Sequence, residues 1–444
     1  MGDYGWPLLM LAGLILGIFS GYPVAFVLAG IGVLFAVLAD VPMLFLSMGV
    51  QRIYSGTLTN WLLVAIPLFV FMGLMLERSG IAERLMRSLA ALFRGMPGGY
   101  AFAVAIIGVI MAASTGIIGA SVVLMGMMAM PAMREANYDM RLASGLIASS
   151  GTLGILLPPS IMLIILGDQM RLSVGDLFMG AIYPGLLLSG LYFLYLLSIA
   201  IFAPHRMPPP ARREAGPIGQ ALWSLVRDLL APMLLILSVL GTIITGIATP
   251  TESAAIGAAG ALLLAFVSGG LNFRALRDSL HDTCKTTAMI VFVMIGASIF
   301  SVVFRRLGGD GMIIDFFDIH ESNPYFVLFI VMALIFVLGF FLDWVEITLV
   351  VVPIVAPVVA ALDFGLPSDQ VMIWFAIALA VNLQTSFLTP PFGYALFYLR
   401  GVAPDLPIST IYRGVTPFVI IQIIALLLVI FFPAIVLSLP MSMR

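Results

Sequence analysis

The sequence is poor in the residues that build soluble surfaces, disulfide scaffolds and metal centres. Charged residues make up 9% of the 444 positions and hydrophobic residues 62%, with three histidines and one cysteine, Cys284. One cysteine excludes an intrachain disulfide and a cysteine-cluster metal site, and so few histidines argue against a haem or buried zinc centre. A soluble domain carries about 25% charged residues, so the composition predicts an all-α polytopic membrane protein in a lipid bilayer.

The basic residues are almost all arginines, and their placement predicts the orientation of the chain. Lys285 is the only lysine, and no basic run suggests a nucleic-acid partner. Because cytoplasmic loops are enriched in Lys and Arg, we expect most arginines to face the cytoplasm and both termini to lie outside. The arginines left on the outer side are Arg52, Arg171, Arg305, Arg306 and Arg444.

Ten segments are long and apolar enough to be spanning helices of about 20 residues. The expected crossings are 5–20, 22–39, 60–77, 140–168 and 177–203 in the first half and 229–248, 252–270, 285–304, 370–399 and 416–438 in the second. Each half has an odd number of crossings, so the second half must enter the bilayer inverted. Segments 42–57 and 271–284 mix apolar and polar residues and are predicted to be interfacial helices.

Proline landmarks indicate that the two halves are copies of one unit. The matched positions, in order, are Pro23 with Pro250, Pro158-Pro159 with Pro390-Pro391, and Pro184 with Pro417. Matching Pro- and Gly-broken segments in two halves are typical of secondary transporters whose site lies at mid-membrane. The predicted inverted repeats are 1–203 and 229–444, joined by a cytoplasmic linker at 204–228.

Two apolar segments, 99–134 and 325–362, do not fit as single spans because both ends of each lie on the same side. Each has a polar break at its middle, Ala113-Ser-Thr-Gly-Ile-Ile-Gly-Ala-Ser121 in the first and Leu342-Asp-Trp-Val-Glu-Ile-Thr348 in the second. We predict two re-entrant helical hairpins that enter from opposite faces, because irregular backbone at that depth needs protein or a wet cavity around it. A pair of tightly turned full spans is the alternative for each segment.

Each hairpin is followed by a helix that two prolines interrupt, and these polar breaks are the candidate binding site. Proline donates no backbone hydrogen bond and blocks its i−4 partner, which frees carbonyl groups near Gly154 and Leu388. Freed carbonyl groups and nearby hydroxyl groups suit Na⁺, whereas helix N-termini suit a substrate carboxylate. The hydroxyl groups at the breaks belong to Ser150, Thr152, Thr385 and Thr389. Alternatively, the hydroxyl groups only bond the i−4 carbonyl and the proline pairs only kink the helices.

Asp343 and Glu346 lie in the second predicted hairpin, where carboxylates are costly and are functional candidates by default. As functional groups they bind a coupling cation or carry a proton. As structural groups they are hydrated near the outer end or paired with Arg305 or Arg306. Trp344 between them is either a lid or an interfacial anchor.

Four motifs resemble the large membrane subunit of tripartite ATP-independent periplasmic (TRAP) transporters, and the resemblance covers nearly the whole chain. They are Asn382-Leu-Gln-Thr-Ser-Phe-Leu-Thr-Pro-Pro-Phe-Gly393, Ala148-Ser-Ser-Gly-Thr-Leu-Gly-Ile-Leu-Leu-Pro-Pro-Ser-Ile161, Phe71-Met-Gly-Leu-Met-Leu-Glu-Arg-Ser-Gly-Ile-Ala-Glu83 and Thr249-Pro-Thr-Glu-Ser-Ala-Ala255. The resemblance implies a bacterial inner-membrane protein with an elevator-type fold that imports an organic acid, driven by a Na⁺ gradient. It also implies two partners, a periplasmic substrate-binding protein and a small four-helix membrane subunit.

The resemblance also implies site residues at the matching positions. The first sodium site falls on Ser114, Thr115, Gly116, Gly151, Thr152 and Gly154. The second falls on Asp343, Thr385, Ser386 and Thr389. The substrate is expected near Ser150, Pro158, Pro159, Ser160, Glu346, Asn382, Gln384, Pro390 and Pro391. The second hairpin tip reads Leu342-Asp-Trp-Val345 where relatives resemble Met-Asp-Gly-Thr, so a C4-dicarboxylate, a 2-oxo acid or another monocarboxylate is open as substrate.

Three other functions compete with a tripartite importer. The first is a stand-alone cation-coupled carboxylate symporter that uses no binding protein. The second is an intramembrane enzyme, which is disfavoured because Asp343 lacks an obvious Asp partner for aspartyl proteolysis. The third is a passive channel, to which two inverted hairpins are less suited than to alternating access.

Overall fold

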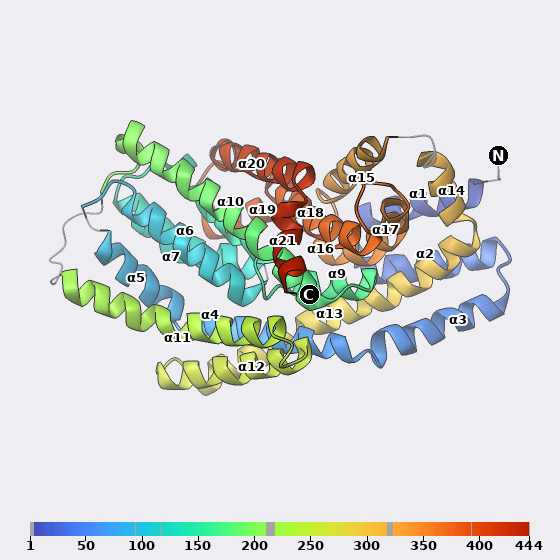
Figure 1. Cartoon of the computed structure of the whole chain (residues 1–444), viewed down its shortest axis with the longest axis horizontal. Coiled ribbons are helices and arrows are strands. Elements are labelled where there is room, and N and C mark those ends of the chain that lie inside the picture. Colours follow the sequence, from blue (N-terminus) through green and yellow to red (C-terminus); the bar gives the residue numbers. More distant parts are fainter. Residues whose placement is uncertain are drawn as a thin grey trace.

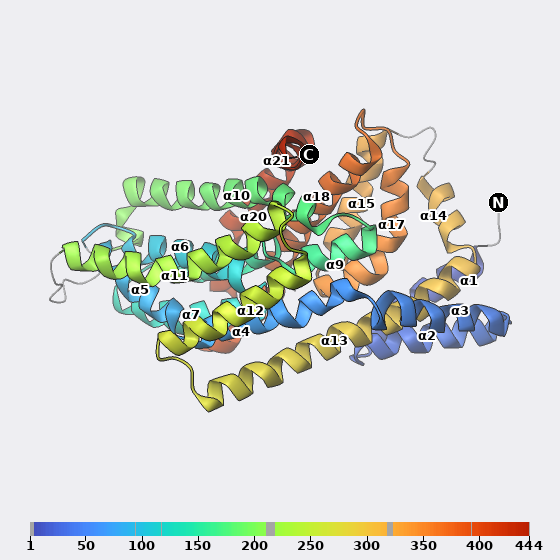
Figure 2. The same cartoon turned by 60° about the horizontal axis from the view of Figure 1, so that its bottom comes forward.

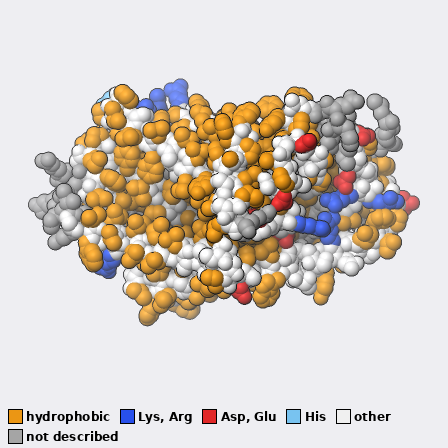
Figure 3. All heavy atoms as spheres, in the orientation of Figure 1, with side chains coloured by type: hydrophobic (Ala, Val, Ile, Leu, Met, Phe, Trp, Pro, Cys, Tyr) orange, Lys and Arg blue, Asp and Glu red, His pale blue; other side chains and the backbone are white. Residues whose placement is uncertain are grey.

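The computed structural model describes residues 4–93, 95–116, 118–209, 218–317, 323–391 and 393–443. Over these residues the regular structure is helical without a β-strand, which confirms the predicted all-α class. Apolar side chains cover much of the face shown in Figure 3, and exposed ones such as Leu16, Phe202 and Phe273 are 72%, 85% and 82% accessible. A surface of this kind requires lipid around it, so the chain is a multi-pass membrane protein.

The first half of the chain forms two short helices, a long bent arm, a hairpin, a broken helix and a final long helix. Their bounds are α1 Gly5–Phe19, α2 Val24–Leu38, α3 Met43–Ile53 extended by a π turn Tyr54–Leu58, a 3₁₀ turn Trp61–Val64 leading into α4 Ala65–Arg78, α5 Ile81–Leu92, α6 Gly99–Thr115, α7 Ile118–Glu135, α8 Met140–Thr152, α9 Ile161–Met170 and α10 Val174–Phe202.

The second half follows a similar order, with longer first helices, one unbroken helix α13 in place of the bent arm, and an added short helix α21 at its end. Their bounds are α11 Ile218–Ile244, α12 Pro250–Val267, α13 Phe273–Arg306, α14 Gly309–Phe317, α15 Pro324–Leu338, α16 Trp344–Glu346 continued by a π turn Ile347–Val351 and by α17 Val352–Ala360, α18 Ser368–Leu388, α19 Tyr394–Val402, α20 Ile408–Phe431 and α21 Ala434–Ser442.

The packing of the outer helices is reciprocal between the halves. Helix α2 of the first half lies along α13 of the second, and α12 of the second half lies along α4 of the first. Figure 2 shows α13 running beside the arm formed by α3 and α4. Copies related by a two-fold axis would produce this exchange. The exact boundary between the units stays a prediction, because residues 210–217 of the expected linker lie outside the described residues.

Both predicted hairpins are present. Helices α6 and α7 form the first, and Gly116 at the end of α6 adopts a left-handed conformation (φ 59°) that a residue without a Cβ adopts freely. Helix α15 and the continuous helix 344–360 form the second. Figure 1 shows the first hairpin in the left half of the molecule and the second in the right half, so the two extend from opposite ends toward the middle.

Seven helices among the described residues are long and apolar enough to cross a bilayer. The other three expected crossings, 5–20, 22–39 and 140–168, consist of shorter helices. One prediction was wrong: segment 271–284 is not a separate interfacial helix but the first part of α13, which has 34 residues. No proline interrupts this stretch, so the helix extends to about 51 Å and exceeds the roughly 30 Å hydrocarbon core.

The two broken helices form the centre of the molecule. Every residue of α8 from Leu142 to Thr152 is buried, and so is every residue of α18 from Ile373 to Leu388. Helix α8 lies so close to α20 that a Cβ atom on Gly145 would be 2.1 Å from the carbonyl oxygen of Gly414. Two glycines therefore set the distance between these helices, as small residues commonly do in membranes.

We expect Gly145→Ala to destabilise the protein by roughly 1–3 kcal/mol, because the added methyl group meets backbone that cannot move aside. Thermal unfolding of the detergent-solubilised chain would show this as a lowered midpoint. The matched control is Gly190→Ala in α10, where nothing lies within 4 Å of the added atom. Equal midpoints for the two variants would contradict the close approach of α8 and α20.

Candidate functional site at the hairpin tips

The first hairpin tip packs against the break in the first half. Helix α8 ends at Thr152, a 3₁₀ turn and a cis Pro158-Pro159 peptide follow, and α9 starts at Ile161. A Cβ on Gly154 would lie 3.4 Å from the carbonyl oxygen of Ala112 and 3.6 Å from the Cα of Gly116. The structure therefore brings together the backbones of Gly116 and Gly154, two residues of the expected first sodium site.

The remaining residues of that expected site divide between two neighbourhoods. Gly151 packs against α7, where a Cβ would lie 2.3 Å from a methyl group of Val122. The hydroxyl of Thr152 donates to the carbonyl of Ser149 at 2.9 Å. The side chains of Ser114 and Thr115 lie outside the described residues, although their backbone completes α6.

The second tip packs against the break in the second half in the same manner. Helix α18 ends at Leu388, a cis Pro390-Pro391 peptide follows, and α19 starts at Tyr394. A Cβ on Gly339 would lie 2.2 Å from the hydroxyl oxygen of Ser386, and the Tyr394 hydroxyl donates to the carbonyl of Phe341 at 3.3 Å.

The hydroxyl groups of the second break bond carbonyls of their own helix. Thr385 donates to Val381 at 2.8 Å, Ser386 to Leu383 at 2.8 Å and Thr389 to Thr385 at 2.7 Å. These bonds are the local pattern of hydroxyl groups in membrane helices, and because each hydroxyl is the donor, both lone pairs of its oxygen stay available for another ligand.

Asp343 and Glu346 form a capping box at the start of the helix 344–360. The Asp343 carboxylate accepts from the Trp344 N–H at 2.8 Å, and the Glu346 carboxylate accepts from the Asp343 N–H at 2.9 Å. The suggested pairing with Arg305 or Arg306 was wrong. Arg305 lies 3.8 Å from Asp310, and the Arg306 guanidinium stacks 4.5 Å above the Phe45 ring. Trp344 is 7% exposed, which places it in the wall of the site rather than at the lipid surface.

A polar cluster buried in the centre joins the two broken helices. Gln384 of α18 and Gln422 of α20 each donate to the Thr152 hydroxyl of α8 at 3.5 Å, and Gln422 also donates to the Tyr192 hydroxyl of α10 at 2.8 Å. All four side chains are at most 1% exposed. These hydrogen bonds connect α8, α10, α18 and α20 and therefore link helices of both halves, although the amide oxygens of both glutamines have no partner.

A cavity of about 230 Å³ lies between the two hairpin tips. Its lining comes from both tips, both broken helices and α13: Ile118, Gly119, Ile161, Thr286, Met289, Ile290, Asp343, Trp344, Val345, Tyr394 and Tyr398. No Lys or Arg side chain is among these lining residues.

Four helices begin at this cavity. Ile118 and Gly119 open α7, Ile161 opens α9, Trp344 opens the helix 344–360, and Tyr394 opens α19. The N-terminal N–H groups of a helix have no intrahelical partners and carry partial positive charge. At the helix 344–360 the first N–H groups already bond the Asp343 and Glu346 carboxylates. The starts of α9 and α19 have no side-chain cap and, with the start of α7, remain as the backbone donors that suit an anion.

The expected substrate residues do not line this cavity. Five of them have buried side chains: Ser150, Pro158, Pro159, Ser160 and Gln384. Ser160 donates to the carbonyl of Ile155 at 2.6 Å, and Asn382 donates to the carbonyl of Met332 at 2.9 Å. Glu346 caps its helix, and Pro390 and Pro391 form the cis peptide that turns the chain into α19. The proline pairs therefore place the helix starts that face the cavity.

Sequence reasoning missed the residues that do line the cavity, apart from Asp343 and Trp344. Tyr394 and Tyr398 lie one helical turn apart directly after the second proline pair, and this spacing was the available signal. Thr286, Met289 and Ile290 share one face of α13, but the sequence does not say which face points inward. Gly119 lies within the quoted hairpin motif, at a place where a Cβ would be 2.8 Å from the Tyr398 ring.

Buried oxygen atoms without a hydrogen-bond partner are candidate ligands for an alkali cation. Among the described residues they are a carboxylate oxygen of Glu77, the hydroxyl oxygens of Ser150, Thr287 and Thr348, and the amide oxygens of Gln384 and Gln422. Within the described part of the chain, no group of three or more His, Cys, Asp or Glu residues is arranged to hold a metal ion. Any bound cation would therefore need mainly hydroxyl and carbonyl ligands, which fit Na⁺.

These features define a polytopic membrane transport protein built from hairpins and broken helices. The chain belongs to the family described as "Tripartite ATP-independent periplasmic transporter, DctM component", whose model matches residues 11–435. This match confirms the resemblance found in the sequence.

Curated relatives are named as permeases, which confirms a transport protein rather than an enzyme. The sialic acid TRAP transporter large permease SiaM of Vibrio cholerae is 30% identical over 95% of this chain and 96% of its own length. The 2,3-diketo-L-gulonate permease YiaN of Escherichia coli is 29% identical over 96% and 97%. The C4-dicarboxylate permease DctM of Pseudomonas aeruginosa is 30% identical over 86% and 87%.

A solved structure shares the fold. The YdaH transporter of Alcanivorax borkumensis superposes with a TM-score of 0.59, covering 96% of this chain and 98% of that one, at 15% sequence identity. An identity this low supports the shared fold alone.

We expect Gln422→Leu to lower stability by roughly 1–3 kcal/mol, because it leaves the buried Tyr192 hydroxyl without its donor. Adding Tyr192→Phe removes that hydroxyl and should recover much of the loss. Thermal midpoints of the two single variants and the double variant measure this coupling. Strictly additive losses would show that the two side chains do not depend on each other.

Proposed function

We propose that this chain is the large subunit of a Na⁺-coupled TRAP transporter that imports an organic acid. The observation that carries the proposal is the cavity ringed by four helix N-termini between the two hairpin tips. The names of all three relatives contain an organic acid: sialic acid, a C4-dicarboxylate and 2,3-diketo-L-gulonate. The substrate carboxylate is bound by backbone N–H groups, with Tyr394 and Tyr398 beside it.

Sodium binds where each hairpin tip meets a broken helix. The first site is at Gly116 and Gly154, with carbonyl oxygens such as that of Ala112 as ligands; the second is at Asp343 with Thr385, Ser386 and Thr389. A cation at either place binds the hairpin tip and the interrupted helix together, so each hairpin tip closes over the substrate only when Na⁺ is bound. Bound Na⁺ also offsets the negative charge of Asp343 next to an anionic substrate.

The transport step is an elevator movement. The hairpins, the broken helices, α10 and α20 form the moving unit, and the outer helices α1–α4 and α11–α13 form the scaffold. The face of α13 that carries Thr286, Met289 and Ile290 is the scaffold side of the cavity. Its few polar groups suit a surface along which the moving unit slides.

The partners follow from the family. A periplasmic binding protein delivers the acid, and a separate small four-helix subunit accompanies the chain in the bacterial inner membrane. Both termini face the periplasm in this orientation.

Uptake of labelled carboxylates into proteoliposomes tests the proposal directly. We expect uptake that requires the binding protein, the small subunit and an inward Na⁺ gradient together. Uptake by this chain alone would instead identify a stand-alone symporter, and uptake without any cation gradient would identify a channel.

Asp343→Asn separates a sodium ligand from a helix cap. The amide oxygen can still accept from the Trp344 N–H, so we expect an unchanged thermal midpoint. The lost charge should weaken apparent Na⁺ affinity in uptake by roughly tenfold or more. The matched control is Asp363→Asn, an exposed carboxylate that accepts from the Gly365 N–H at 2.8 Å. Unchanged Na⁺ affinity in Asp343→Asn would leave this residue a capping role only.

A further inference from the structure

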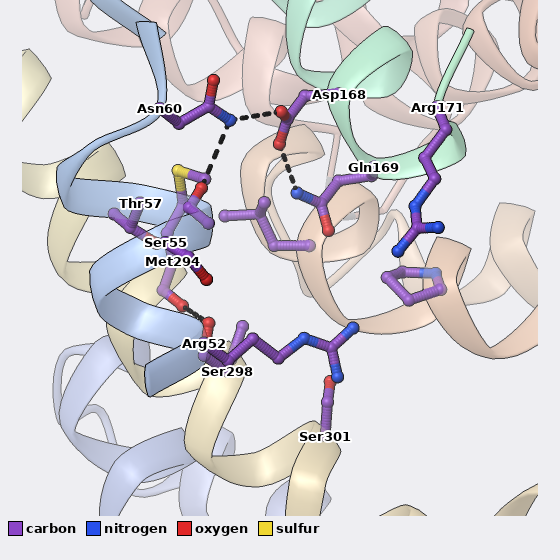
Figure 4. Close-up of a pocket in the computed structure, with 14 residues that line it drawn as sticks. Arg52, Ser55, Thr57, Asn60, Asp168, Gln169, Arg171, Met294, Ser298 and Ser301 are labelled. Atoms are coloured by element: carbon purple, nitrogen blue, oxygen red, sulfur yellow. Dashed lines mark hydrogen bonds between the residues drawn. The ribbon is translucent and has the colours of Figure 1, made fainter. Parts of the chain in front are cut away.

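A second cavity, of about 350 Å³, opens where α3, the end of α9, α13 and α17 meet. Figure 4 shows the side chains of Arg52, in α3, and Arg171, directly after α9, projecting into the same opening, with Ser301 on the side of Arg52. It shares no lining residue with the cavity between the hairpin tips.

The charge of this cavity is positive. Its one carboxylate, Asp168, already accepts from Asn60 at 2.5 Å and from Gln169 at 2.9 Å. No described carboxylate lies within ion-pair distance of Arg52 or Arg171. Partial burial and the guanidinium groups of Arg305 and Arg171 lower the pKa of Arg52, with Asp310 opposing them. An anion would relieve this repulsion.

The arginines here are those that the charge distribution left on the outer side. Arg52, Arg171 and the adjacent pair Arg305-Arg306 come from three distant parts of the sequence, yet Arg171 and Arg305 both repel Arg52, and Arg306 stacks on Phe45 of α3. Arginine is depleted from the outer side of membrane proteins. A cluster of arginines at one cavity on this side therefore indicates that positive charge has a functional role there.

The same three helices line both cavities. On α13 the lining continues from Ile290 to Met294, Ala297 and Ser301; on the helix 344–360 it continues from Val345 to Leu349 and Pro353; on α9 it runs from Ile161 to Asp168. Steps of three or four residues follow one helix face. From Ile290 to Ser298 the rise is about 12 Å. The two cavities therefore lie in line along shared walls.

We propose that the arginine-lined cavity is an outer vestibule that receives the carboxylate of the substrate before it enters the cavity between the hairpin tips. Arg52 and Arg171 attract and pair with the carboxylate, and the hydroxyl groups of Thr57 and Ser301 supply further donors. The acid then passes from side-chain charge to backbone N–H groups along the shared faces of α9, α13 and the helix 344–360. This inference rests on the proposed import of an organic acid.

The test places a thiol in the vestibule and measures its local potential. Ser298→Cys is made in a Cys284→Ser background, since Cys284 is the only native cysteine. The chain, in detergent with its small subunit, is reacted with methanethiosulfonates carrying either a sulfonate or a trimethylammonium group. We expect the anionic reagent to react faster by roughly tenfold or more, as charge-lined clefts enrich counter-ions.

Two variants and one matched control show which arginines cause the faster reaction of the anionic reagent. Arg52→Gln and Arg171→Gln should each reduce the ratio of anionic to cationic rates severalfold. Arg306→Gln removes an arginine of the same region that does not line the cavity, and should leave most of the ratio intact. Equal rates for the two reagents, or an equal effect of all three variants, would overturn the vestibule.

Protection by carboxylates identifies the ligand. Pyruvate and succinate, each tested at saturating concentration, should slow the reaction of the anionic reagent with the introduced thiol when sulfate at equal ionic strength does not. Arg171→Gln should abolish the protection. Equal protection by sulfate, or protection by neither carboxylate, would overturn a carboxylate receptor.

The outcome is distinguishable from failure of the proposed function. Labelling is done without a membrane or a gradient, so it reports the vestibule even if uptake proves to be independent of Na⁺ or of a binding protein. The converse result is that an acid is taken up with Na⁺ and yet does not protect the introduced thiol. That result would support the proposed transport function and contradict the proposed vestibule. In uptake, Arg171→Gln should raise KM severalfold with kcat unchanged.

Discussion

The structure depends on one constraint: backbone polar groups inside a membrane protein must find partners within the protein. Each proline pair interrupts a helix whose residues before the break are buried at the centre of the molecule. The tip of a hairpin covers each break, at Gly116 and Gly154 in the first half and at Gly339 and Ser386 in the second. The glycines allow the close approach, so hairpin and broken helix form one unit that neither could form alone.

This constraint is the basis of the proposed anion site in a cavity without a basic side chain. An interruption that ends one helix starts another, and a helix start without a side-chain cap presents unpaired N–H groups. Four helices start at the cavity, and Asp343 and Glu346 cap one of them. Backbone donors suit the middle of a membrane better than a guanidinium group, because they stay neutral overall when the ligand leaves. Arginines are found instead in the proposed vestibule, where water reaches them.

Much of the fold could be predicted from sequence, whereas most residues that line the cavity between the hairpin tips could not. Charge at both ends of 99–134 and 325–362 was enough to predict two hairpins, and the proline pairs located both broken helices. Most of the expected substrate residues lie in the motifs around the two proline pairs, yet Gln384 joins Thr152 in the buried cluster and Asn382 donates to the carbonyl of Met332. A polar side chain in a membrane helix satisfies the nearest partner, and sequence does not show which helix lies opposite.

The sequence by itself determined the membrane class, the element order, the breaks and the family, because hydropathy, charge and proline act locally along the chain. Only the tertiary structure decided which surfaces meet. It joined α13 into one helix, placed Tyr394 and Tyr398 with Asp343, gave Asp343 and Glu346 a shared cap, and gathered Arg52 and Arg171 at one opening. These contacts join residues distant in sequence, and their geometry follows from how helices of both halves pack, which no local pattern encodes.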